Sequence, residues 1–66
     1  MNIILNGSPK YFAEAVHVED VVRSLCKNPA HIIAELNGSI VPKTARGTTP
    51  IKEGDQLELV SFVGGG

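Results

Sequence analysis

Several features that would mark common protein classes are missing from this sequence of 66 residues. It has one cysteine, Cys26, so no internal disulfide can form and packing alone must hold the fold. Its six basic and seven acidic residues are spread along the chain, without the Lys/Arg run that nucleic-acid binding usually needs. No apolar run approaches the roughly 20 residues needed to cross a bilayer, and the start does not look like a signal peptide. We therefore expect a cytoplasmic protein that binds neither nucleic acid nor a membrane.

Motifs of conventional catalysis are missing as well. There is no Gly-rich loop followed by Lys-Ser/Thr, no dinucleotide-binding fingerprint and no acidic metal site. Cys26, His17 and His31 are too few and too irregularly spaced for a zinc site. A free cysteine is usually a small buried hydrophobe, and nothing next to Cys26 clearly activates its thiol. The sequence thus predicts a chain that is not itself an enzyme and binds no metal or cofactor.

What is present indicates one small folded domain. The chain is 42% hydrophobic and 20% charged, which suits a compact fold with a small core. Asn6-Gly7 and Asn37-Gly38 predict two tight hairpins, because both residue types tolerate the positive φ of a primed turn. Pro9 cannot donate to a strand ladder, so it should sit at the beginning of its strand. The expected strands are residues 2–6, 10–15, 32–37, 40–41 and 56–63.

One helix is expected between the two hairpins, over residues 18–27, with His17 at its beginning. Its apolar positions follow the i, i+3, i+4, i+7 spacing of one helical face, and Asn28-Pro29 should end it. Residues 43–50, rich in threonine, are interpreted as a loop, and Gly54 as a turn residue with positive φ. The expected buried face consists of Val18, Val21, Val22 and Leu25.

The predicted order ββ-α-ββ-β defines the fold class. One helix across one mixed sheet of about five strands is an economical way to bury the valine face. If the first and last strands are neighbours, they run parallel at the centre of the sheet, as in the ubiquitin-like β-grasp. The expected fold is therefore α+β, with a single β-grasp domain over residues 1–63 and a flexible glycine tail over residues 64–66.

The tail, Gly64-Gly65-Gly66, is the strongest functional signal. Glycine adds no side chain to pack and costs the most entropy to order. Three extended residues reach roughly 10 Å and, without Cβ atoms, can enter a narrow slot. Their only reactive group is the α-carboxylate of Gly66, which is ionised and a poor electrophile at neutral pH. It becomes useful once activated, for example as an acyl-adenylate, and this chain has no motif for using ATP, so an ATP-using partner is implied.

Three segments carry a resemblance to a known family: residues 35–42 (ELNGSIVP), 53–60 (EGDQLELV) and 62–66 (FVGGG). Their order resembles the ThiS family, the sulfur carriers of thiamine biosynthesis, over essentially the whole chain. The resemblance implies that a ThiF-like adenylyltransferase activates Gly66. A cysteine desulfurase or another donor would then supply sulfur for a thiocarboxylate, and thiazole synthase would take that sulfur. Gly65 and Gly66 match the family's reactive end.

The last strand adds a candidate docking surface. Leu57 and Leu59 alternate with Glu58, Val60 and Phe62, so the two sets lie on opposite faces. If the leucines face the helix, the exposed Val60 and Phe62, together with Gly64, form a patch that suits docking on a partner enzyme.

Alternative functions remain open on the sequence alone. Residues 43–50 lack the aromatic residue of many relatives, and Lys43 stands where an arginine is common. The alternatives are a sulfur carrier of the molybdopterin branch, a ubiquitin-like modifier and a non-reactive interaction module. The receiving synthase, the sulfur donor and the oligomeric state are not predicted.

Overall fold

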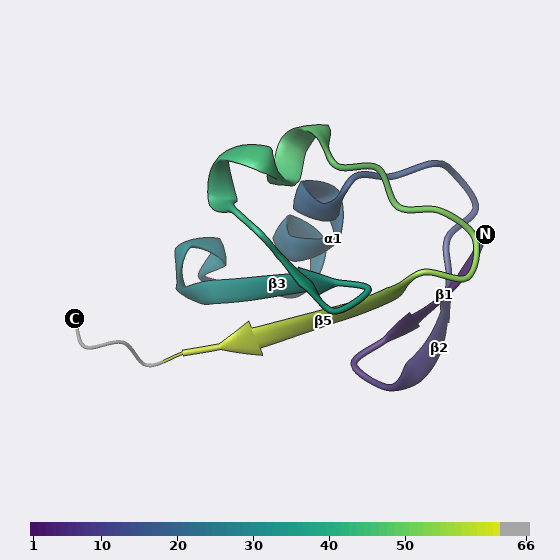
Figure 1. The fold of residues 1–66 in the computed structure, drawn as a ribbon, viewed down its shortest axis with the longest axis horizontal. Helices are drawn as coiled ribbons and strands as arrows, with labels where there is room; N and C mark the ends of the chain where they lie inside the picture. The colour runs from purple at the N-terminus through teal and green to yellow at the C-terminus, as the bar shows by residue number, and fades with distance from the viewer. Residues whose placement is uncertain (63–66) are drawn as a thin grey trace.

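The last strand occupies the centre of the sheet (Figure 1). The computed structural model describes residues 1–62, whose strands form one sheet in the order β2-β1-β5-β3-β4. Strand β5 is parallel to β1 and antiparallel to β3, and helix α1 (Val18–Leu25) packs over one face. This confirms the predicted β-grasp. The strands are β1 (Asn2–Leu5), β2 (Ser8–Tyr11), β3 (Ile32–Leu36), β4 (Ser39–Val41) and β5 (Gln56–Ser61).

Both Asn-Gly turns are present, but the strand after the first one was misplaced. Asn6 and Gly7 have φ of 49° and 82°, the positive values that a primed turn requires. Because this turn has two residues, the return strand begins at once, with Pro9 opposite Ile4. The predicted strand over residues 10–15 is therefore wrong in its position. Proline is tolerated inside β2 because β2 is an edge strand, where half of the amides need no partner.

The asparagines of the two turns also hold the central strand from both sides. The Asn6 Oδ1 accepts the Leu59 N–H at 2.8 Å. The Asn37 Oδ1 accepts the Gln56 N–H at 2.9 Å, and its Nδ2 donates to Asp55 Oδ1 at 3.0 Å. These bonds join turns to a strand far along the chain, so local sequence patterns could not predict them.

Replacement of Asn37 should separate the contribution of these bonds from that of turn geometry. Asn37→Gly keeps the positive φ of 52° and loses the side-chain bonds, which should cost about 1–2 kcal/mol of unfolding free energy. Asn37→Ala should cost about 1 kcal/mol more, because alanine is strained at positive φ. Urea denaturation of both variants measures the two terms. An Asn37→Gly variant as stable as the parent would contradict the role of the side chain.

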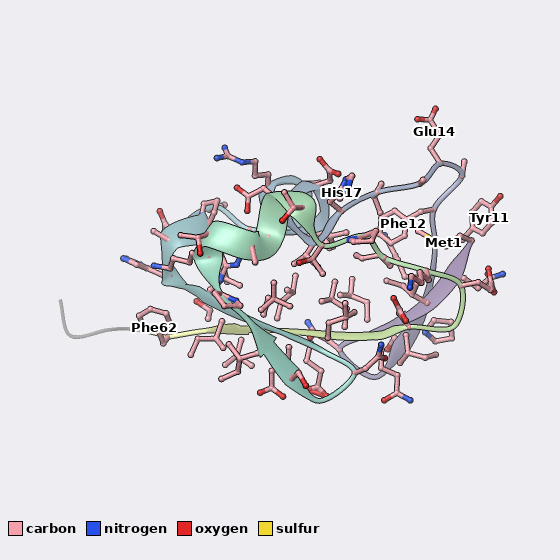
Figure 2. The ribbon with its side chains drawn as sticks, turned by 45° about the horizontal axis from the view of Figure 1, so that its top comes forward. Met1, Tyr11, Phe12, Glu14, His17 and Phe62 are labelled. Atoms are coloured by element: carbon pink, nitrogen blue, oxygen red, sulfur yellow. The ribbon has the colours of Figure 1, made fainter. Side chains whose placement is uncertain are left out.

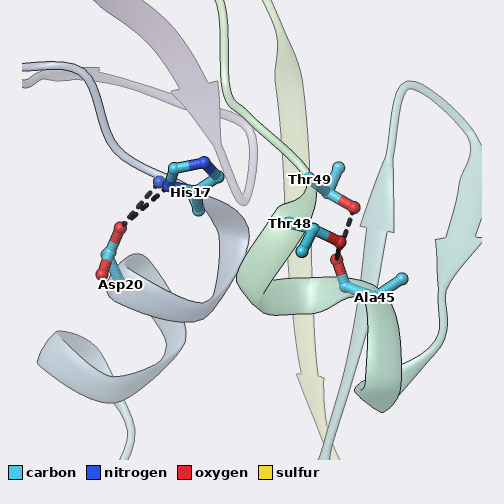
Figure 3. Close-up of polar contacts among 5 residues, drawn as sticks. All are labelled: His17, Asp20, Ala45, Thr48 and Thr49. Carbon is cyan, nitrogen blue, oxygen red and sulfur yellow. Dashed lines mark hydrogen bonds and ion pairs between the residues drawn. The ribbon is translucent and has the colours of Figure 1, made fainter.

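The helix begins where expected and ends early. The His17 backbone N–H donates to Asp20 Oδ2 at 2.8 Å, which fixes the first turn (Figure 3). Val18, Val21 and Val22 are buried as predicted. The helix ends at Leu25 rather than at residue 27, and the Leu25 side chain, in the last turn, is 48% exposed, so its assignment to the buried face was wrong. Among residues 1–62, no helix has the length and apolar character needed to span a bilayer.

Residues 43–50, expected as a loop, contain the 3-10 helix η2 (Lys43–Thr48). The hydroxyls of Thr48 and Thr49 donate to the Ala45 carbonyl at 3.3 Å and 2.6 Å (Figure 3). The Val18 N–H then donates to the Thr49 carbonyl at 3.0 Å, which ties the end of η2 to the start of α1. Threonine hydroxyls that bond to nearby carbonyls explain how a Thr-rich segment forms ordered structure.

Candidate functional site

The structure describes some of the candidate functional residues and not others. Gly64, Gly65 and Gly66, together with Val63, lie outside the described residues, so the predicted tail is not tested. The predicted strand over residues 56–63 was too long, because Phe62 is already outside the strand. Strand β5 ends at Ser61, and Phe62 follows it directly. Leu57 is fully buried and Leu59 packs against the core. Val60 and Phe62 are 48% and 37% exposed, so the predicted alternation of faces is confirmed.

Phe62, the last described residue before the glycines, is held by a short helix that the sequence did not reveal. The 3-10 helix η1 (Pro29–His31) precedes β3. The Phe62 N–H donates to the His31 carbonyl at 2.9 Å, and the two rings lie with centroids 5.9 Å apart at 47°. Figure 2 shows the Phe62 side chain at the end of the sheet. His31, considered from sequence only as a weak zinc ligand, thus contacts the residue from which the tail starts.

Arg46 of η2 supports η1 from the interior. Its side chain is 3% exposed, an unusual burial for a charged residue. Its Nη1 donates to the Pro29 carbonyl at 3.1 Å and its Nη2 donates to the Ile32 carbonyl, while Nε has no partner among residues 1–62. The segment expected as a loop therefore places an arginine in the interior. A single arginine in a Thr-rich segment offers no sequence signal for this role.

An apolar patch lies on the open face of the sheet, opposite α1, and we call it the open-face patch. Ile33 on β3 lies directly opposite Val60 on β5. A groove of about 240 Å³ lies beside them, lined in part by Ile33, Ile40, Pro42 and Phe62. Sequence reasoning found only the part of this patch on the last strand, because β3 and β4 join it through sheet pairing. The patch consists of Ile33, Ile40, Val60 and Phe62, which are 38%, 66%, 48% and 37% exposed.

Cys26 lies apart from this patch. It is partly buried and packs against the core, and its backbone N–H donates to the Val22 carbonyl at 2.9 Å. A second hollow of about 230 Å³ passes Cys26, Lys27 and Ser61. Within the part of the chain that the structure describes, no three His, Cys, Asp or Glu side chains gather as a metal site would require. Cys26 thus packs at the end of the helix.

Within residues 1–62, the central strand β5 parallel to β1, the one α-helix packed across the sheet and the exposed end of β5 define a protein of the ubiquitin-like β-grasp class. The ThiS family model matches residues 3–66, and the chain therefore belongs to the ThiS family, whose members are small sulfur carriers of thiamine biosynthesis. A crystal structure of the thiamine biosynthesis protein ThiS from Geobacter metallireducens superposes with a TM-score of 0.86. It is 33% identical in sequence, and the match covers 100% of both chains.

Two longer relatives extend the comparison. Thiazole synthase of Paramagnetospirillum magneticum and thiazole synthase of Magnetococcus marinus are each 33% identical over the 66 residues. The match covers 100% of this chain but only 20% of those proteins. A segment similar to this chain thus occurs within the longer polypeptides.

Proposed function

We propose that this chain carries sulfur on the C-terminal carboxylate of Gly66 for thiazole formation in thiamine biosynthesis. The observation that carries the proposal is the family match, which continues through the glycines to residue 66. The relatives named thiazole synthase favour the thiazole branch over the molybdopterin branch. The proposed place of action is the cytoplasm.

The proposed chemistry has two steps on one carbon atom. A ThiF-like adenylyltransferase catalyses attack of the Gly66 carboxylate on ATP, which releases pyrophosphate and leaves an acyl-adenylate. A hydrosulfide ion then attacks the acyl carbon; where the donor is a cysteine desulfurase, an external thiol releases this ion from the enzyme's persulfide and is itself oxidised to a disulfide. The carbon–sulfur bond forms, AMP leaves with the electron pair of the broken bond, and a thiocarboxylate remains. ATP and the sulfur donor belong to the partners, and this chain supplies the carboxylate.

The fold supports this chemistry by giving the tail a rigid starting point. Strand β5 is bonded on both sides, to β1 and β3, and the Phe62 N–H is bonded to η1. A tail attached to such a fixed point loses less conformational freedom when its carboxylate enters a partner's active site. Glycines beyond Phe62 add no Cβ atoms that a narrow entrance would exclude. The chain is thus suited to act as a protein co-substrate.

Intact-mass spectrometry tests the proposal. The chain would be incubated with ATP, a cognate adenylyltransferase and a sulfide or desulfurase source. We expect a mass gain equal to the replacement of one oxygen by sulfur, localised by fragmentation to Gly66. Absence of both adenylate and thiocarboxylate with several cognate activating enzymes would favour a non-reactive interaction module instead.

Phe62 and Val60, with Gly64 beyond them, are proposed to contact the partner enzymes. Phe62→Ala should raise the Kd for a partner by about 5- to 30-fold, because a partly exposed aromatic side chain at a docking site is a typical binding hot spot. The unfolding free energy should fall by less than about 1 kcal/mol, because alanine keeps the backbone bond to His31. Calorimetric titration and thermal denaturation measure the two effects. Equal losses of binding and stability would contradict a docking role.

A further inference from the structure

Two carboxylates face each other across the centre of the sheet. Glu35 on β3 is directly opposite Glu58 on β5. Both alternate along their strands with the buried residues Ala34 and Leu57, so they lie on the open face. Side chains directly opposite each other have Cβ atoms about 4.5–5.5 Å apart, and like charges at that spacing repel. This pairing of like charges therefore does not stabilise the free fold.

No cation in the described part of the chain relieves the repulsion. The ion pairs of residues 1–62 are Arg23 with Glu19 and His17 with Asp20, both at helix α1. The other cross-strand neighbour of Glu35 is Ile40, which is apolar. Lys43, which lines the groove, forms no ion pair with another of the described residues. The carboxylate pair is therefore available to a cation from outside the chain.

The carboxylate pair adjoins the open-face patch. One step of two residues along each strand leads from Glu35 and Glu58 to the Ile33–Val60 pair, and Phe62 follows. The groove of about 240 Å³ begins at these apolar residues. A protein interface typically joins buried apolar anchors to charges that set orientation and encounter rate. Apolar anchors and an unneutralised acidic pair thus form one continuous surface.

We propose that Glu35, Glu58 and the open-face patch form a docking surface for an apolar surface of thiazole synthase that presents an arginine or lysine between the two carboxylates. This inference rests on the proposed function. The charge of the occupant follows from the acidic pair, because one cation between two carboxylates converts repulsion into attraction. The two longer relatives point to its identity, because a segment similar to this chain is joined there to a thiazole synthase.

This arrangement makes stability and binding move in opposite directions. Removing one charge relieves repulsion in the free chain, so Glu35→Gln and Glu58→Gln should each raise the melting temperature by about 1–5 °C. The same substitutions should raise the Kd for thiazole synthase by about 3- to 10-fold, because they remove an acceptor for the partner's cation. A residue with only a structural role would not gain stability while it loses affinity.

The test is a titration of the purified 66-residue chain into the cognate thiazole synthase, alongside thermal denaturation. Glu14→Gln is the matched control, because Glu14 is an exposed carboxylate outside the sheet and Figure 2 shows its side chain directed away from the fold. Glu58→Lys adds a stronger contrast: it should stabilise the chain further by pairing with Glu35 and weaken binding by about tenfold or more. Added salt should weaken the parent complex more than that of Glu58→Gln.

Four results would overturn the inference. They are affinities of both Gln variants equal to that of Glu14→Gln, a loss of stability that parallels the loss of binding, no binding of the parent to the synthase, and self-association of the parent through this face. The mass gain at Gly66 is measured without the synthase, so the carrier function can hold while this docking surface fails. If the mass gain is absent, the proposed function fails first.

Discussion

Deletion of Gly66 is expected to reduce thiocarboxylate formation by at least about 100-fold, because the carboxylate then ends about 3.5 Å short of its position in the partner's active site. Misplacement of a reacting group by even 1 Å can cost about this much. Gly66→Ala keeps the chain length and the carboxylate and adds one methyl group. It should also react slowly if the entrance around the tail is narrow. The measurement is the rate of thiocarboxylate appearance by intact mass.

The melting temperature supplies the control for this deletion. The described core is formed by residues between Ile3 and Leu57, far along the chain from Gly66, so the deletion should leave thermal stability unchanged. The variant should also retain binding to thiazole synthase through the open-face patch. A deletion variant that forms thiocarboxylate at the parental rate would place the chemistry on another residue and contradict the carrier proposal.

Replacement of Arg46 by alanine is expected to lower the unfolding free energy by about 2–4 kcal/mol, a large part of the stability of a domain this small. The substitution leaves a cavity and removes the donors to the carbonyls of Pro29 and Ile32, which lie partly or fully buried. Arg46→Met is the matched variant, because methionine fills similar space without a buried charge. Its cost should be smaller, since removing the desolvated guanidinium offsets part of the lost bonding.

Hydrogen exchange should show which backbone amides lose protection when Arg46 is replaced. Arg46 supports η1, and the His31 carbonyl of η1 accepts the Phe62 N–H. In Arg46→Met, the Phe62 amide should exchange at least about tenfold faster, whereas the Leu59 amide, bonded to Asn6 on the other side of β5, should keep its protection. Equal acceleration at both amides would mean global destabilisation and contradict the specific link from Arg46 to Phe62.

Local patterns predicted much of the fold because its strongest constraints are local. The two Asn-Gly turns, the start of the helix at Val18 and the alternation of Leu57 and Leu59 with exposed neighbours each follow from residues a few positions apart. Errors arose at the ends of elements. The second strand is Ser8–Tyr11 rather than residues 10–15, because the two-residue turn leads directly into it, and Leu25 is exposed because it ends the helix.

For this protein the sequence by itself determined the β-grasp order, the membership of a carrier family and the glycine end that makes Gly66 the candidate reactive residue. Only the tertiary structure decided how the end of β5 is held and what surrounds it. Arg46 bonds to η1, η1 bonds to Phe62, and Glu35 is paired with Glu58 in the sheet. Each of these pairs joins segments that are distant in the chain. Such contacts depend on the register of the folded sheet, which no window of neighbouring residues encodes.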